Sequence, residues 1–112
     1  MALNKKDEFK KAEVQLADFF KVLSHPARIA ILKALAKHQS CICGELVEVL
    51  PLAQSTVSQH LKELKRVGLI QGTIDGPKSC YCIDWDVFNQ FNKQIGLFTS
   101  GLLEKAQKNN CC

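Results

Sequence analysis

The stretch QSTVSQHLKELKRVG, residues 54–68, decides the fold of this chain. Its apolar side chains Val57, Leu61 and Leu64 recur at spacings of four and three, which is the period of an α-helix with one buried face. A glycine closes the stretch, as is typical of a helix end. Short polar side chains occupy the first two turns, and basic side chains follow them. We therefore predict a helix over residues 54–67 whose outer face suits an anionic partner.

Three helices are expected before this stretch. Apolar residues at helical spacing predict the first over about 7–22 and the second over about 25–37. The Ser-His-Pro run at 24–26 should begin the second helix, with the serine as cap and the proline in the first turn, while its histidine packs or caps there. A short third helix is expected over 45–50, and Pro51 ends it.

The hydrophobic period changes after residue 68. Residues 69–74 and 79–83 predict two short strands, joined by the turn Asp-Gly-Pro-Lys at 75–78. Residues 84–106 return to a helical pattern with a long apolar stripe. The order predicts a mainly α domain with a small β-hairpin, arranged as a winged helix-turn-helix.

Length and composition predict one globular domain over residues 1–112, with an N-terminal arm at 1–6 and a flexible cysteine-containing tail at 107–112. Hydrophobic residues make up 46% and charged residues 23%, which is ordinary for a folded protein. No apolar run approaches the ~20 residues of a membrane span. The first residues carry no apolar signal segment. We therefore expect a cytoplasmic protein with no membrane partner.

The outer face of the 54–67 helix predicts a DNA-contacting surface. Hydroxyl and amide side chains near the start of such a helix can reach base edges in the major groove, and basic side chains such as Arg66 can reach phosphates. The net charge of +4 is partly concentrated over residues 54–78. A solvated helix that contacts nothing is the alternative, but the turn before it and the hairpin after it favour DNA. The predicted DNA-contacting residues are Gln54, Ser55, Thr56, Ser58, Gln59, His60, Lys62, Lys65 and Lys78.

Six cysteines occur in three close pairs. Because no export signal is seen, we expect reduced thiols that bind metal or react with oxidants, in preference to a disulfide framework. Cys41 and Cys43 share a face only in an extended segment, since two residues of a helix rotate by about 200°. Cys80 and Cys82 should face one side of the second strand, either as ligands or as packing residues. The predicted metal ligands are Cys41, Cys43, Cys111 and Cys112.

Three segments taken together resemble the ArsR/SmtB family of metal-responsive repressors. They are LSHPARIAIL at 23–32, QSTVSQHLKEL at 54–64 and GLI at 68–70, and the resemblance covers about residues 9–100. It implies a homodimer built on helices 1 and 5, the first and last, that binds a palindromic double-stranded operator and releases it when metal or metalloid binds. The long apolar stripes of those two helices support the dimer, and the alternative is that helix 1 covers helix 5 within one chain. Ala53 departs from the family, which often has a capping Ser or Asn there, so this helix should be capped poorly, or by Ser55 instead.

The Cys-x-Cys motif resembles the arsenic and cadmium sensors of this family. Arsenic-responsive members often continue to a third cysteine, where this chain has Leu46. Zinc sensors use Asp and His pairs on the last helix, and residues 84–106 contain no histidine. The resemblance therefore implies As(III) as inducer, with Sb(III), an organoarsenical or Cd(II) as alternatives, and no organic cofactor. A redox- or persulfide-sensing repressor of the same fold is the second hypothesis. An enzyme is not expected, because no histidine lies beside a cysteine at a motif spacing.

Overall fold

The computed structural model describes residues 9–38, 41–42, 50–74 and 79–106. The elements within them follow the order α1 (Lys11–Val22), α2 (Pro26–Ala36), α3 (Gln54–Arg66), β1 (Ile70–Thr73), β2 (Cys80–Ile83) and α4 (Trp85–Ala106). The prediction of a mainly helical domain with a small hairpin is confirmed. Residues 45–49 of the helix expected over 45–50 lie outside the described residues, as do the terminal arm and tail and four predicted site residues, Cys43, Lys78, Cys111 and Cys112.

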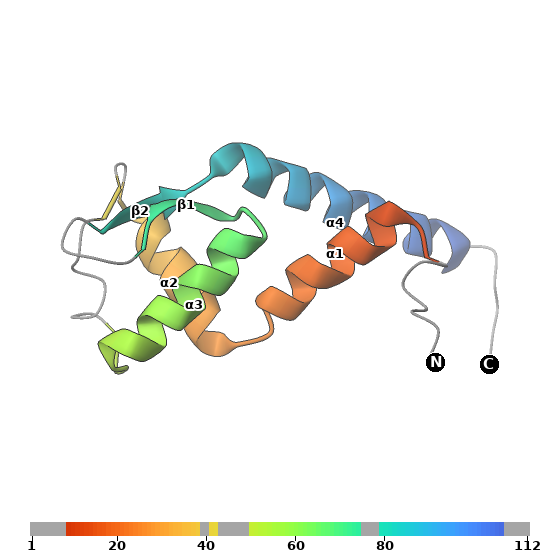
Figure 1. The fold of residues 1–112 in the computed structure, drawn as a ribbon. Helices are drawn as coiled ribbons and strands as arrows, with labels where there is room; N and C mark the ends of the chain where they lie inside the picture. The colour runs from red at the N-terminus through yellow and green to blue at the C-terminus, as the bar shows by residue number, and fades with distance from the viewer. Residues whose placement is uncertain (1–8, 39–40, 43–49, 75–78, 107–112) are drawn as a thin grey trace.

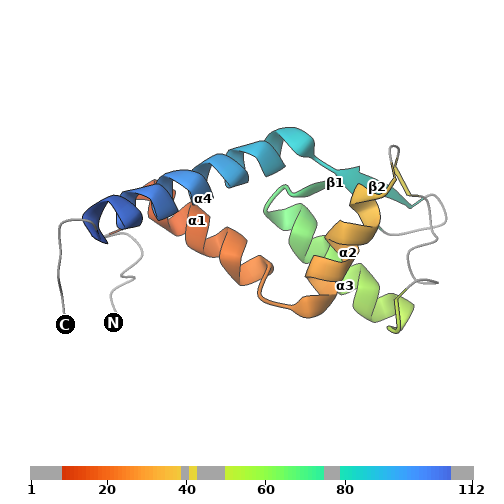
Figure 2. The same ribbon diagram turned by 180° about the vertical axis from the view of Figure 1, so that it is seen from behind.

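The elements form two groups (Figures 1 and 2). Both views show α1 lying beside the long α4, while α2, α3 and the hairpin gather at the start of α4. Phe19 of α1 packs on Phe91 of α4 with ring centroids 4.8 Å apart. Gln94 of α4 donates a hydrogen bond of 2.9 Å to the side chain of Gln15. The aromatic contact and the side-chain hydrogen bond together hold α1 against α4.

One hydrophobic core joins the helices to the hairpin. It takes side chains from α1, α2, α3, both strands and the start of α4, which fixes α3 on its inner side. Burying one such aliphatic side chain contributes about 1.5–3 kcal/mol to stability. The side chains with the least exposure in this core are Val22, Ile31, Val57, Leu61, Leu64, Leu69 and Ile70.

Side chains cap the helices, though not always the expected ones. His25, in place of Ser24, is the N-cap of α2, and its Nδ1 accepts the Ala27 N–H at 3.0 Å. Ser24 instead donates from Oγ to the carbonyl of Lys21 at 2.7 Å, at the end of α1. Ala53 begins α3 without a side-chain cap, as its methyl group requires, and Ser55 lies inside the helix. The serine cap was therefore the wrong prediction, while the poor capping of α3 is confirmed.

The hairpin is attached directly to the end of α3. Gly68 has a φ of +88°, a left-handed conformation that ends the helix. The N–H of Leu69 then donates to the carbonyl of Leu64 at 3.0 Å. The two strands pair antiparallel, with Ile70 opposite Ile83. The position of the hairpin therefore follows that of α3.

Candidate functional site

The outer face of α3 carries most of the residues predicted to contact DNA. Val57, Leu61 and Leu64 are buried on its inner side. The opposite side is solvated, because the core occupies only one face of the helix. The residues predicted there are placed as follows: Gln54, Ser55, Gln59, Lys62 and Lys65 are exposed, and Thr56 and Ser58 are half-buried.

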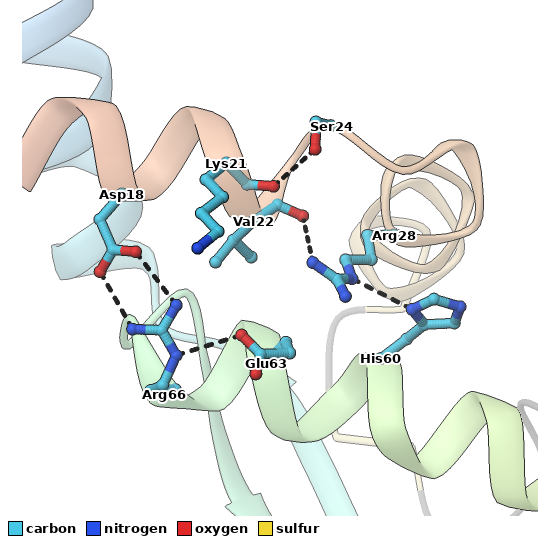
Figure 3. Close-up of polar contacts among 8 residues, drawn as sticks. All are labelled: Asp18, Lys21, Val22, Ser24, Arg28, His60, Glu63 and Arg66. Carbon is cyan, nitrogen blue, oxygen red and sulfur yellow. Dashed lines mark hydrogen bonds and ion pairs between the residues drawn. The ribbon is translucent and has the colours of Figure 1, made fainter.

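His60 does not belong to that outer face. Only 8% of the residue is exposed, and its ring lies 4.4 Å from the ring of His25. Its Nδ1 accepts a hydrogen bond of 3.0 Å from Nε of Arg28, whose Nη1 also donates to the carbonyl of Val22 at 3.0 Å (Figure 3). The sequence placed His60 among the DNA contacts, but the structure gives it an internal role. Its side chain fixes α3 to the junction of α1 and α2.

The pKa of His60 is lowered from its ordinary value. Burial is the largest cause, because the charged imidazolium loses its hydration, and the positive charges of His25 and Arg28 add to it. The hydrogen bond from Arg28 requires a bare Nδ1, so the neutral ring carries its proton on Nε2 by inference from the network. The interior side of α3 therefore depends on a neutral histidine.

The basic residues at the end of α3 are engaged within the protein. Lys65 donates from Nζ to the carbonyl of Gly72 in β1 at 2.6 Å. Arg66 makes two hydrogen bonds of 3.0 Å to the carboxylate of Asp18 and one of 3.1 Å to Glu63 (Figure 3). These carboxylates raise the pKa of Arg66 above its already high value. Arg66 thus ties α3 to α1, and its charge is already compensated before any phosphate approaches.

The structure joins Cys41 to Cys82 of β2, a partner that the predicted ligand set did not contain. The two cysteines form a disulfide with Cα atoms 4.5 Å apart, across 41 residues of sequence. The backbone beside them pairs as well, because Ile42 and Tyr81 exchange hydrogen bonds of 2.9 and 3.0 Å. Cys41 therefore lies in an extended segment. Two cysteines at the Cys-x-Cys spacing can share a face only in such a segment.

Cys80 and Cys82 share one side of β2, as predicted. Both are half-buried, while Tyr81 and Ile83 between and after them are buried in the core. The second Cys-x-Cys at 80–82 repeats the spacing at 41–43, but this repeat does not indicate that Cys82 pairs with Cys41. Within the described residues no three His, Cys, Asp or Glu side chains converge as a metal cluster.

The chain is similar to known helix-turn-helix regulators of transcription. A family model described as a helix-turn-helix domain matches residues 23–73. The chain is 35% identical over 80 residues to the uncharacterized HTH-type transcriptional regulator MJ1325 of Methanocaldococcus jannaschii, covering 70% of this chain and 89% of that protein. It is 30% identical over 86 residues to the arsenical resistance operon repressor of Staphylococcus xylosus, covering 77% of this chain and 82% of that repressor.

A third relative is more similar over a shorter segment. The HTH-type transcriptional repressor SmtB of Mycobacterium tuberculosis is 41% identical over 64 residues, which span 57% of this chain and 47% of that repressor. Among solved structures, an ArsR-like transcriptional regulator from Rhodococcus sp. RHA1 superimposes with a TM-score of 0.73 over 88% of this chain and 92% of its own, at 20% identity. The chain thus shares its fold and its helix-turn-helix with regulators of transcription.

Proposed function

We propose, from the premise that this chain belongs to the ArsR/SmtB family of helix-turn-helix transcriptional regulators, that it is a homodimeric repressor which releases a palindromic operator when As(III) binds its cysteine thiolates. The observation that carries the DNA-binding part is the outer face of α3. Its polar side chains lie at the start of the helix, on the side opposite the core, with the hairpin attached to the helix end.

In this proposal α3 enters the major groove. Gln54, Ser55 and Gln59 lie in the first two turns, where hydroxyl and amide groups of a recognition helix reach base edges. Lys62 lies about one turn further on, where an ammonium group reaches a phosphate. Lys78 would add a second phosphate contact from the hairpin turn. Because the core holds α3 on its inner side, the approach of these groups to DNA is set by the fold.

The homodimer is proposed from the apolar surface of α4. The exposed fractions of Leu97, Leu102 and Leu103 are 74%, 58% and 67%. A cluster of this kind at the end of a long helix indicates an interaction surface. Two-fold pairing along α1 and α4 would cover it and would set two recognition helices about 34 Å apart, one turn of DNA.

The proposed input is a thiophilic ion. Soft thiolates favour soft ions, and Cys41, Cys43, Cys111 and Cys112 are the predicted ligands. The similarity to a repressor named for arsenical resistance supports As(III) in preference to zinc. Sb(III), an organoarsenical and Cd(II) are the alternative inducers. The proposed site of action is the cytoplasm, where thiols stay reduced.

The test follows release of DNA from the reduced full chain. A duplex selected by the protein from a randomised pool is labelled, and its fluorescence anisotropy is followed as arsenite, antimonite, cadmium or zinc is added. We expect release by arsenite, with Cys41→Ser and Cys43→Ser retaining DNA affinity and losing release. Absence of any DNA binding by the reduced protein would overturn the repressor, and normal release from both variants would overturn the thiolate input.

A redox-sensing repressor is the second candidate, and the disulfide between Cys41 and Cys82 favours it. Two thiols would lose two protons and two electrons to a hydroperoxide, which is reduced to water and an alcohol. Hydrogen peroxide added without any metalloid separates the two candidates. The redox sensor is selected if peroxide causes release of the DNA, dithiothreitol reverses that release, and arsenite has no effect.

A further inference from the structure

Sulfur atoms from two separate parts of the chain meet beside the hairpin. Cys41 belongs to the segment that leads into the helix-turn-helix, and Cys82 belongs to β2. We propose that Cys82 supplies a thiolate to the same ion as Cys41, so that a bound metalloid clamps β2 to the segment entering the helix-turn-helix. The inference rests on the metalloid input proposed above and replaces the tail cysteines by Cys82 as the third ligand.

The backbone register brings these sulfurs together. Ile42 and Tyr81 exchange both of their backbone hydrogen bonds, which makes them a hydrogen-bonded antiparallel pair. The next pair along must then be Cys41 and Cys82, and its Cα separation of 4.5 Å is that of a non-hydrogen-bonded pair, whose side chains lie closest. The juxtaposition is therefore built into the strand pairing and does not depend on a chance rotamer.

The same pairing sets the direction of the side chains. Successive side chains of an extended segment alternate between two faces. Ile42 and Tyr81 are buried, with 7% and 3% of each residue exposed. Cys41 and Cys82 therefore take the opposite face, where Cys41 is exposed and Cys82 half-buried. An ion from solvent can reach these sulfurs without disturbing the core.

Reduction converts the pair into two thiols that a single ion can bridge. Sulfurs close enough to bond need only side-chain rotation to take up one larger atom between them. The remaining sulfur of a three-thiolate site comes from Cys43 in the proposed function, and that residue lies outside the described part of the chain. Cys80 shares the face of Cys82, two residues away on the same strand.

Such a clamp would act on the hairpin and through it on α3. The hairpin follows α3 through the Leu69–Leu64 hydrogen bond, and Lys65 of α3 donates to Gly72 of β1. An ion that fixes β2 to the segment before the helix-turn-helix therefore constrains both parts that would contact DNA. Ligands confined to Cys41, Cys43 and the tail would leave the hairpin untouched.

The test is differential alkylation of the reduced full chain. The protein is treated with iodoacetamide with and without one equivalent of arsenite, and modified cysteines are located by mass spectrometry. We expect arsenite to protect Cys41, Cys43 and Cys82, and to leave Cys111 and Cys112 reactive. Protection of Cys111 and Cys112 with full alkylation of Cys82 would overturn the inference. Absence of protection at any cysteine would instead overturn the metalloid input itself.

The affinity of a series of variants for arsenite tests the same inference. Loss of groups that merely support a ligand typically lowers metal affinity by 10–100-fold, so Cys82→Ser should weaken arsenite binding at least about 100-fold. Ser79→Ala, a half-buried neighbour beside β2, controls for disturbance of the hairpin, and the Cys111→Ser/Cys112→Ser double variant should bind arsenite as the wild type does. Equal arsenite affinity in Cys82→Ser and wild type, with DNA binding intact in both, would overturn the inference.

Discussion

Nε of Arg28 donates a 3.0 Å hydrogen bond to Nδ1 of His60, and this bond joins the first turn of α2 to the middle of α3. The same guanidinium donates to the carbonyl of Val22 at the end of α1. Three helices therefore meet at one cation, as Figure 3 shows. The bond exists only while the imidazole is neutral at Nδ1, so protonation of His60 would set two cations against each other.

Acid should weaken this junction. The pKa of His60 in the folded protein is lowered below 6.5, by burial first and then by the charges of His25 and Arg28. Between the two pKa values the unfolded chain binds a proton that the folded chain does not, so the free energy of unfolding rises with pH there. We expect urea unfolding to show full stability above about pH 6.5 and a loss as the pH falls through the folded-state pKa.

His60→Gln provides the control for that prediction. Glutamine can accept the hydrogen bond from Arg28 through its side-chain oxygen and does not titrate. The stability difference between pH 7.5 and pH 5.5 should therefore be smaller in this variant than in the wild type. The same difference in both proteins would assign the acid sensitivity to other groups.

Arg28→Met should destabilise the protein at neutral pH. The substitution keeps most of the side-chain volume and leaves Nδ1 of His60 and the carbonyl of Val22 without their donor. A lost hydrogen bond that involves a charged group costs about 1.5–3 kcal/mol. Urea unfolding at pH 7.5 should show a decrease of that size, and Lys33→Met, at an exposed position of α2, should change stability by less than about 0.5 kcal/mol. A decrease in Arg28→Met no larger than in the control would contradict this role.

The local signals of the sequence located the elements well. Gly68 ended α3, and Asp84 accepts the N–H groups of Asp86 and Val87 at 3.1 and 3.2 Å, so α4 starts where its acidic residues predicted. Capping at α2 was misplaced by one residue, because Ser24 and His25 can both accept an N–H and only the backbone conformation decides between them. Local chemistry sets such boundaries, which is why sequence predicts them.

The site was predicted less completely, for two different reasons. His60 lies three residues after Val57 and four before Leu64, so helical spacing alone would have placed it on the buried face. Its polar character led instead to the outward assignment. The pairing of Cys41 with Cys82 had no such signal, because it depends on a strand register across 41 residues. Long-range pairing of this kind is set by the packing of the whole domain.

Lys62→Ala should weaken DNA binding in a salt-dependent manner. Removing one phosphate contact reduces the slope of log affinity against log salt by about 0.9. Lys33→Ala is the charge-matched control. Lys33 belongs to α2 and lines a pocket with Trp85 and Phe88 at the start of α4, so it is not part of the outer face of α3. Binding of the selected duplex should be measured from 50 to 200 mM salt. Equal slopes for the two variants would place Lys62 away from the DNA.

Gly72→Ala should destabilise the hairpin. Gly72 has a φ of +118°, and an added Cβ would overlap the carbonyl oxygen of Cys80 on the paired strand. The conformational strain alone costs on the order of 1–3 kcal/mol. Gly101→Ala is the matched control, because no atom of the described residues lies within 4 Å of its added Cβ and alanine favours the helix by roughly 0.5–1 kcal/mol. Thermal unfolding should therefore shift down for the first variant and not for the second.

Leu102→Glu should dissociate the proposed dimer without unfolding the chain. Leu102 is 58% exposed, so the fold itself tolerates a charged side chain there, whereas an interface formed over it does not. An unpaired charge buried in an interface costs about 3 kcal/mol or more, which raises the dimer dissociation constant at least about 100-fold. Sedimentation velocity over a range of concentrations measures this, with circular dichroism to verify the helix content. Asn89→Glu adds the same charge to an exposed position near the start of α4 and should remain dimeric. If Leu102→Glu also remains dimeric and binds the duplex as tightly as the wild type, the two-fold axis does not pass over this end of α4.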